Sequence, residues 1–388
     1  MKTALFLISI SYAIIGFTQE KKSTVEVGLF SSLNLDQHFN HENELINPRD
    51  FPKQTLSALE FYEGAALAID SLNAIGKSIS LKLYDVQSYQ GNISKAFENG
   101  DFDQLDMIIA QVGGNEFFQL AIIAKEMNIP IINATYPNTR GITASPDLYI
   151  VNPRINVHLE LIYQKIGRNW KTANIVWFTK EKATEKQLEN IFGNLNSQQG
   201  KIGLKYKTAN LNEDFNIKDV TKYFDSIKTN VWILGSFDEA FATKFVSIAN
   251  DVLPKEKLHL IGMPNWESLK EIQAKKYANM AIYYTMAFYL PHENLFVRRM
   301  DEIYKTSMGV KSPTMALKGF EITYYFCSLL EKYKKIKIGQ PGESGFKVLT
   351  DFDFQPVILD QSSKETDFIE NKHIRFIRRL NNQTLPYF

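Results

Sequence analysis

The sequence lacks the features that mark several common classes of protein. One cysteine, Cys327, is present among 388 residues, so an internal disulfide is excluded. Lys and Arg together number 44, and Asp and Glu number 43. This balance leaves no basic surplus for nucleic acid or for an anionic membrane surface. Cys327 lies within an apolar helical pattern, which favours a buried, unreactive thiol.

Linear motifs of nucleotide binding and catalysis are also missing. No Gly-x-Gly-x-x-Gly follows a predicted strand, and no Walker-type loop, Gly-x-Ser-x-Gly elbow, Cys-x-x-Cys or His-Glu-x-x-His is present. Many active sites have no such signature, so this absence favours binding without excluding catalysis. We expect a protein that is not an enzyme and needs no cofactor. His38 and His41, beside Glu42 and Glu44, could hold a metal ion, but a hydrated polar loop is the favoured interpretation.

The N-terminus has the pattern of a secretory signal peptide. A basic start at Lys2 precedes an apolar stretch, residues 3–17, that is too short to cross a membrane. We expect cleavage after Thr18, which removes residues 1–18. No cysteine lies near this position to carry a lipid anchor, and no later apolar run is long enough to span a bilayer. The mature protein is therefore expected to be soluble and either periplasmic or secreted.

The stretch from Asp106 to Tyr136 predicts one strand–helix–strand unit. Residues 106–112 form a short apolar run of the kind that a strand buried on both faces needs. A helical pattern follows in residues 116–127, and residues 129–133 form a second buried run. This order is typical of a parallel βαβ unit with a right-handed crossover.

The turn inside this unit is a candidate ligand site. Gly113 and Gly114 permit backbone angles that side chains disfavour, and Asn115 is expected to cap the following helix. The turn lies at the carboxyl end of a strand and presents unpaired N–H groups at a positive helix N-terminus. Open α/β sheets bind ligands in this position, and carboxylates suit it.

Strands and helices alternate along the chain, which is too long for one compact core. We therefore expect an α/β fold with two doubly wound parallel-sheet lobes. Lobe one is assigned to residues 19–149 and 287–344, and lobe two to residues 150–286 and 345–388. The last of these segments is expected to add antiparallel strands to lobe two. The polar stretch 35–54 is expected to be a long loop, either a lid or an insertion.

Other strand ends supply further candidate side chains. The candidate ligand-binding residues are Ser31, Gly113, Gly114, Asn115, Thr135 and Tyr136 in lobe one, and Ser236, Phe237 and Trp266 in lobe two. Tyr136 and the nearby Arg140 could contact a ligand or pack the loop that carries them. Trp266 could stack on a ligand or belong to the core. Lone carboxylates at strand and helix ends, such as Asp85 and Glu116, are expected to be dipole partners and not acid catalysts.

Four segments resemble the type I periplasmic substrate-binding proteins, specifically the branched-chain amino-acid receptor group in its Bacteroidetes-type exported form. The segments are Glu60-Phe-Tyr-Glu-Gly-Ala-Ala-Leu-Ala-Ile69, Asp106-Met-Ile-Ile-Ala-Gln-Val-Gly-Gly114, Ile129-Pro-Ile-Ile-Asn133 and Lys318-Gly-Phe-Glu-Ile-Thr-Tyr-Tyr-Phe326. The resemblance covers nearly the whole mature chain, and its motifs are packing motifs.

The resemblance implies two lobes joined by three crossovers, with a small-molecule ligand held between them. It also implies that the closed form docks on a membrane transporter or a sensor. In the family, the loops after the third and fourth strands supply N–H and hydroxyl groups to the ligand's carboxylate. These positions fall on Gly113, Gly114, Asn115 and Thr135.

The chain departs from the family at two places beside this site. Ala110-Gln111 stands where the family usually has Gly-Pro, and Gly114-Asn115 replaces an expected serine. No peptidoglycan-binding LysM module is present. Two hypotheses therefore stay open. The first is a solute-binding protein that holds an amino acid or peptide-like ligand for uptake or sensing. The second is a cell-envelope scaffold or regulator that has the same fold without a small ligand, with peptidoglycan or a protein as its partner.

Overall fold

The computed structural model describes residues 24–40, 42, 44–47, 52–89, 91–251, 255–291, 293–336, 338, 343–360 and 362–388. The predicted signal peptide and its cleavage site lie outside these residues, as does His41. Within the described ranges no helix is both long enough and apolar enough to span a membrane. The same ranges contain no group of three His, Cys, Asp or Glu side chains arranged to hold a metal ion.

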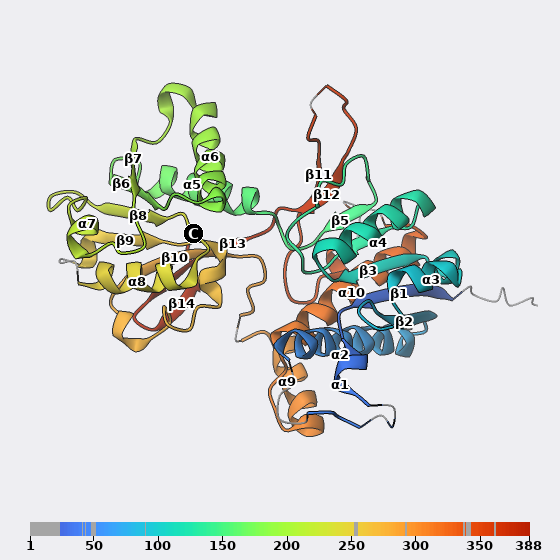
Figure 1. Cartoon of the computed structure of the whole chain (residues 1–388). Helices are drawn as coiled ribbons and strands as arrows, with labels where there is room; N and C mark the ends of the chain where they lie inside the picture. Colours follow the sequence, from blue (N-terminus) through green and yellow to red (C-terminus); the bar gives the residue numbers. More distant parts are fainter. Residues whose placement is uncertain are drawn as a thin grey trace, which may run out of the picture.

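The strands form two seven-stranded sheets, one in each lobe (Figure 1). The first sheet has the order β11-β12-β5-β4-β3-β1-β2, and the second has the order β14-β13-β10-β9-β8-β6-β7. Neighbours from β12 to β2 in the first sheet, and from β10 to β7 in the second, run parallel. The predicted α/β fold of two largely parallel lobes is confirmed.

The bounds of the elements are as follows. Lobe one contains β1 (Val25–Ser31), α1 (Leu35–His38), α2 (Lys53–Ala74), β2 (Ile79–Asp85), α3 (Ile93–Glu98), β3 (Met107–Gln111), α4 (Gly114–Met127), β4 (Ile131–Asn133), β5 (Leu148–Ile150), α9 (Leu295–Met308), α10 (Thr314–Tyr333), β11 (Phe354–Val357) and β12 (Phe368–Asn371). Lobe two contains α5 (Ile155–Asn169), β6 (Asn174–Thr179), α6 (Ala183–Gln198), β7 (Tyr206–Asn210), α7 (Ile217–Thr221), β8 (Asn230–Leu234), α8 (Glu239–Asn250), β9 (Leu258–Ile261), the short 3₁₀ helix η4 (Pro264–Glu267), β10 (Ala281–Met286), β13 (Arg375–Leu380) and β14 (Gln383–Pro386).

Helices cover both faces of each sheet because strand side chains alternate between two buried clusters. In β3, Ile109 belongs to the cluster under α2 and α10, whereas Ile108 belongs to the cluster under α4. In β8, Trp232 packs with α8 and Ile233 packs with α5 and α6. Cys327 lies fully buried in the α10 cluster, so its predicted burial is confirmed, and burial raises the pKa of its thiol to about 12.

Helices α2 and α10 touch through two glycines. A Cβ added to Gly64 would lie 1.8 Å from the carbonyl oxygen of Ala316, and one added to Gly319 would lie 2.1 Å from the carbonyl oxygen of Phe61. No side chain fits at either position, so the two helix backbones approach closely and form one layer over the first sheet.

The C-terminal segment is divided between the lobes, which corrects the predicted boundary. Strand β12 pairs parallel with β5 and antiparallel with β11, so residues 354–371 belong to lobe one and not to lobe two. The ring of Phe354 lies 6.2 Å from that of Tyr149, inside the core of lobe one. Strands β13 and β14 extend the second sheet. The extended pattern of this tail is visible in the sequence, but a short strand's own pattern does not specify which sheet edge it joins.

Three connections cross between the lobes, after β5, after β10 and after β12, as the fold prediction required. The fully buried carboxylate of Glu370, at the end of β12, ties the first and third together. Its Oε1 accepts bonds from the main-chain N and from Nε of Arg154, both at 2.9 Å, and Oε2 accepts from Lys372 Nζ at 2.6 Å. Burial raises the pKa of Glu370, but the bonds from these two cations outweigh it and the pKa is lowered.

The stretch predicted as a long loop, residues 35–54, is partly folded. It contains the short helix α1 and a bridge between Phe39 and Leu45, and α2 already begins at Lys53. Asp85, at the end of β2, anchors its start, because the carboxylate accepts bonds from the main-chain N–H groups of residues 33, 34 and 35 at 3.0, 3.1 and 2.8 Å. Whether this segment acts as a lid stays open.

Candidate functional site

The glycine turn after β3 lies where the sequence predicts it, but its cap is different. Helix α4 begins at Gly114, which has a φ of 59°, and Gly113 precedes it without a side-chain cap. The prediction that Asn115 caps the helix is wrong, because its Oδ1 accepts a bond from Arg140 Nη2 at 2.8 Å. In the part of the chain that the structure describes, no side chain bonds to the main-chain N–H groups of residues 114–116, so these donors stay open to a ligand.

A cavity of about 230 Å³ lies beside this turn. It is lined by Ser32, Gln54, Gln111, Val112, Gly113, Thr135, Tyr136 and Pro137. Ser31 stands behind the lining, because it is fully buried and its hydroxyl donates to Gln111 Oε1 at 2.5 Å. The structure therefore brings together the predicted residues of the β3 and β4 loops, and Ser31 positions the Gln111 amide.

Tyr136 combines the two roles that the sequence left open. Its ring lies against Gly113, where an added Cβ would come within 3.0 Å, and it packs on Phe117 with ring centroids 5.8 Å apart. The same residue lines the cavity. The ring thus packs the loop and also forms part of the cavity wall.

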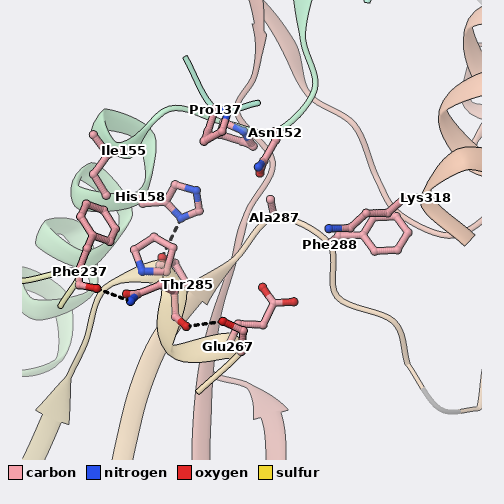
Figure 2. Close-up of a pocket in the computed structure, with 14 residues that line it drawn as sticks. Pro137, Asn152, Ile155, His158, Phe237, Glu267, Thr285, Ala287, Phe288 and Lys318 are labelled. Carbon is pink, nitrogen blue, oxygen red and sulfur yellow. Dashed lines mark hydrogen bonds between the residues drawn. The ribbon is translucent and has the colours of Figure 1, made fainter. Parts of the chain in front are cut away.

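A second cavity, of about 270 Å³, lies between the lobes and is shown in Figure 2. We call it the interlobe cavity. It is lined by Pro137, Asn152, Pro153, Ile155, His158, Phe237, Pro264, Asn265, Glu267, Ser268, Thr285, Ala287, Phe288 and Lys318. Pro137 lines both cavities, so the two lie on either side of this residue.

Two charged side chains of opposite sign enter the interlobe cavity from opposite lobes. Lys318 extends from α10 of lobe one, with Nζ 5.2 Å from the centre of the Phe288 ring. Glu267 ends η4 of lobe two. Burial lowers the pKa of Lys318, an effect that Glu267 opposes, and burial raises the pKa of Glu267, an effect that Lys318 opposes. The two opposite charges therefore attract each other across the cavity.

His158 of α5 stands at the hinge end of the same cavity. Its Nδ1 lies 2.8 Å from the hydroxyl of Thr285 in β10, and both residues are buried. Burial lowers the pKa of His158 to about 4, against a main-chain bond at Pro153 and the negative charge of Glu370, which both favour the protonated ring. The imidazole is therefore neutral at neutral pH, and its hydrogen bond to Thr285 links α5 to β10.

Two of the predicted lobe-two residues face the core in this structure. Ser236 is fully buried and its hydroxyl donates to Glu185 Oε1 at 2.6 Å. Trp266 is fully buried against Gly262, where an added Cβ would lie 1.9 Å from the indole. Of the two interpretations of Trp266, the core position is therefore the one observed. Phe237, the third, does line the interlobe cavity.

Most of the interlobe cavity has no signal in the sequence. Lys318 lies within a packing motif, and Glu267 follows Trp266 without a signal of its own. Neither residue follows a glycine turn, so no local signal marks them. A weak signal exists for Gln111, because a polar residue ends an otherwise apolar strand next to Gly113.

No protein-family model and no curated protein sequence matches this chain. Solved structures do. A branched-chain amino acid ABC transporter periplasmic ligand-binding protein of Burkholderia xenovorans aligns with a TM-score of 0.63 and 10% identity, covering 93% of this chain and 91% of that one. An ABC transporter substrate-binding protein of Desulfitobacterium hafniense, in complex with Leu, aligns with a TM-score of 0.56 and 13% identity, covering 94% of this chain and 100% of that one.

A third structure, the branched-chain amino acid transporter substrate-binding protein LivJ of Streptococcus pneumoniae in complex with isoleucine, aligns with a TM-score of 0.53 and 12% identity, covering 93% of this chain and 98% of that one. At these identities the likeness concerns the fold. The chain has the two-lobed type I periplasmic-binding-protein fold over almost its whole described length.

Proposed function

We propose that this protein is an exported solute-binding protein that holds an amino acid or a peptide-like molecule between its lobes for uptake or sensing. The observation that carries the proposal is the open helix N-terminus at Gly113–Gly114, which borders a cavity that neighbours the interlobe cavity across Pro137. Donors in that arrangement suit a carboxylate. Solved structures of the same fold hold Leu and Ile.

The proposed grip is built mainly from main-chain groups. The N–H groups of residues 114–116, with Thr135 and the Gln111 amide beside them, bind the acidic end of the ligand. Phe237 of lobe two and the apolar residues next to it then cover the ligand when the lobes approach each other. Such closure occurs only if the ligand binds the closed state more tightly than the open one. The closed form would present both lobes to a membrane transporter or a sensor.

Thermal melting against a library of amino acids, short peptides and sugars tests this function. A ligand at about 100 times its Kd stabilises the folded state by about 2.7 kcal/mol. For lobes of this size the Tm should rise by about 5–10 °C. If no compound shifts the Tm at millimolar concentration, the proposed function fails.

A matched pair of variants at Asn115 then tests the main-chain grip. Asn115→Pro removes the N–H group in the first helical turn, where proline is tolerated, and Asn115→Ala removes the side chain while keeping the N–H. We expect Asn115→Pro to lose about 1.5–3 kcal/mol of binding free energy for the ligand found in the screen. Asn115→Ala should bind nearly as the parent does. Calorimetry measures both, and equal affinities for the two variants would contradict the grip.

A further inference from the structure

The interlobe cavity contains charges that the proposed carboxylate grip does not use. Lys318 and Glu267 both line it, one from each lobe (Figure 2). Among the described residues neither side chain forms an ion pair within 4.0 Å or a hydrogen bond, and the Lys318 ammonium lies over the face of Phe288, 5.2 Å from the ring centre. Lys318 is half-buried, whereas Glu267 is more exposed to solvent. A half-buried ammonium without a direct partner is unfavourable unless something else neutralises it.

A ligand can neutralise both. The ammonium of Lys318 attracts an acidic group on the lobe-one side, and the carboxylate of Glu267 attracts an ammonium group on the lobe-two side. The helix N-terminus at Gly113–Gly114 adds a second position for an acidic group in the cavity that adjoins at Pro137. The two neighbouring cavities thus offer two positions that favour negative charge and one that favours positive charge.

The walls between these charged positions are mostly apolar. Pro137, Ile155, Phe237, Pro264 and Phe288 line the interlobe cavity. They suit methylene groups that connect the charged ends of a ligand. The cavities of about 230 and 270 Å³, on either side of Pro137, suit a molecule whose two acidic groups lie well apart.

We propose, on the basis of the solute-binding function above, that the ligand is acidic. It carries two carboxylates and one ammonium group, as an acidic amino acid or a short peptide with one acidic side chain does. Lys318 determines this specificity by pairing with the second carboxylate, and Glu267 pairs with the ammonium group.

Matched probes separate this ligand class from neutral amino acids. Calorimetry on the mature chain compares L-glutamate with L-glutamine, and the dipeptide Gly-Glu with Gly-Gln. In each pair one carboxylate becomes an amide of the same shape. We expect the acidic member of at least one pair to bind at least about tenfold tighter, because a buried charged hydrogen bond is lost in the amide.

Substitutions at Lys318 and Glu267 test whether these two residues recognise the charged groups of the ligand. Lys318→Met keeps an apolar stem on Phe288 and removes the charge, so the preference for the acidic probe should fall to about twofold or less. Lys311→Met makes the same charge change at an exposed position just before α10, and the preference should persist there. Glu267→Gln should reduce the preference for L-glutamate over glutarate, which lacks the ammonium group. Melting curves of the variants confirm that each is folded.

The outcomes distinguish this inference from the function on which it rests. Equal binding of acidic and amide probes, or a preference that survives Lys318→Met, overturns the acidic-ligand proposal. Binding confined to apolar amino acids, neutral peptides or sugars overturns it too, while the solute-binding function stands. If neither these probes nor the broader library bind, both proposals fail.

Discussion

His158 illustrates how a single buried side chain makes the free energy of unfolding depend on pH. It is neutral because burial lowers the pKa of its imidazole to about 4, and its Nδ1 pairs with Thr285 at 2.8 Å. In the unfolded chain the pKa returns to about 6.5. The stabilisation is therefore complete above pH 6.5 and is lost as the pH falls from about 6.5 to about 4, because only the unfolded chain takes up the proton in this window.

The expected loss from His158 across that window is about 3 kcal/mol of unfolding free energy. In His158→Gln, the amide can still reach Thr285 but does not titrate, so stability should fall less steeply between pH 6.5 and 4. Denaturant unfolding at several pH values measures the difference from the parent. His259, whose pKa burial lowers to about 4, and His373, whose pKa burial also lowers, remain in the variant and contribute to the residual slope. Identical slopes in the two proteins would show that His158 does not act in this way.

At the scale of elements, local signals placed most boundaries correctly. Asn128 ends α4 with a φ of 56°, and the side chain of Asp238 caps α8 by accepting from the N–H of Phe241 at 2.9 Å. Signals of this kind lie within four residues of the feature that they control. Contacts between elements do not, and the close approach of α2 and α10 depends on glycines more than 250 residues apart.

We expect Gly64→Ala to destabilise lobe one by about 2–3 kcal/mol, because its Cβ would overlap the Ala316 carbonyl oxygen 1.8 Å away and force the helices apart. Gly167→Ala is the matched control. It lies inside α5, and its Cβ would meet only Leu204 at 4.0 Å, so it should be neutral or stabilise by up to about 1 kcal/mol. Denaturant unfolding compares them. Similar effects at both positions would contradict the packing argument.

At the scale of the whole molecule, one buried carboxylate links two of the connections between the lobes. Glu370 receives two bonds from the Arg154 guanidinium, at 2.9 and 3.0 Å, and one from Lys372, so it connects two of the three crossings. Figure 1 shows the lobes joined by these crossings, so the network holds two of the connections together.

Glu370→Gln should therefore cost about 3 kcal/mol of unfolding free energy, since it leaves two cations without their shared partner. Asp351→Asn provides a contrast, because its ion pair with Arg375 is exposed and 3.4 Å long, and its loss should cost less than 1 kcal/mol. Thermal unfolding measures both changes. An equal, small effect of the two substitutions would mean that the buried network does not stabilise the fold.

The sequence by itself determined the alternating α/β pattern, the two lobes and the glycine turn at the end of β3, because these follow from periods of two and 3.6 residues and from turn residues close in the chain. The tertiary structure alone decided that residues 354–371 join lobe one, that Trp266 faces the core, and that Lys318 and Glu267 face one cavity. Whether a side chain meets solvent, core or cleft depends on elements far away in the chain, and no local pattern encodes that packing.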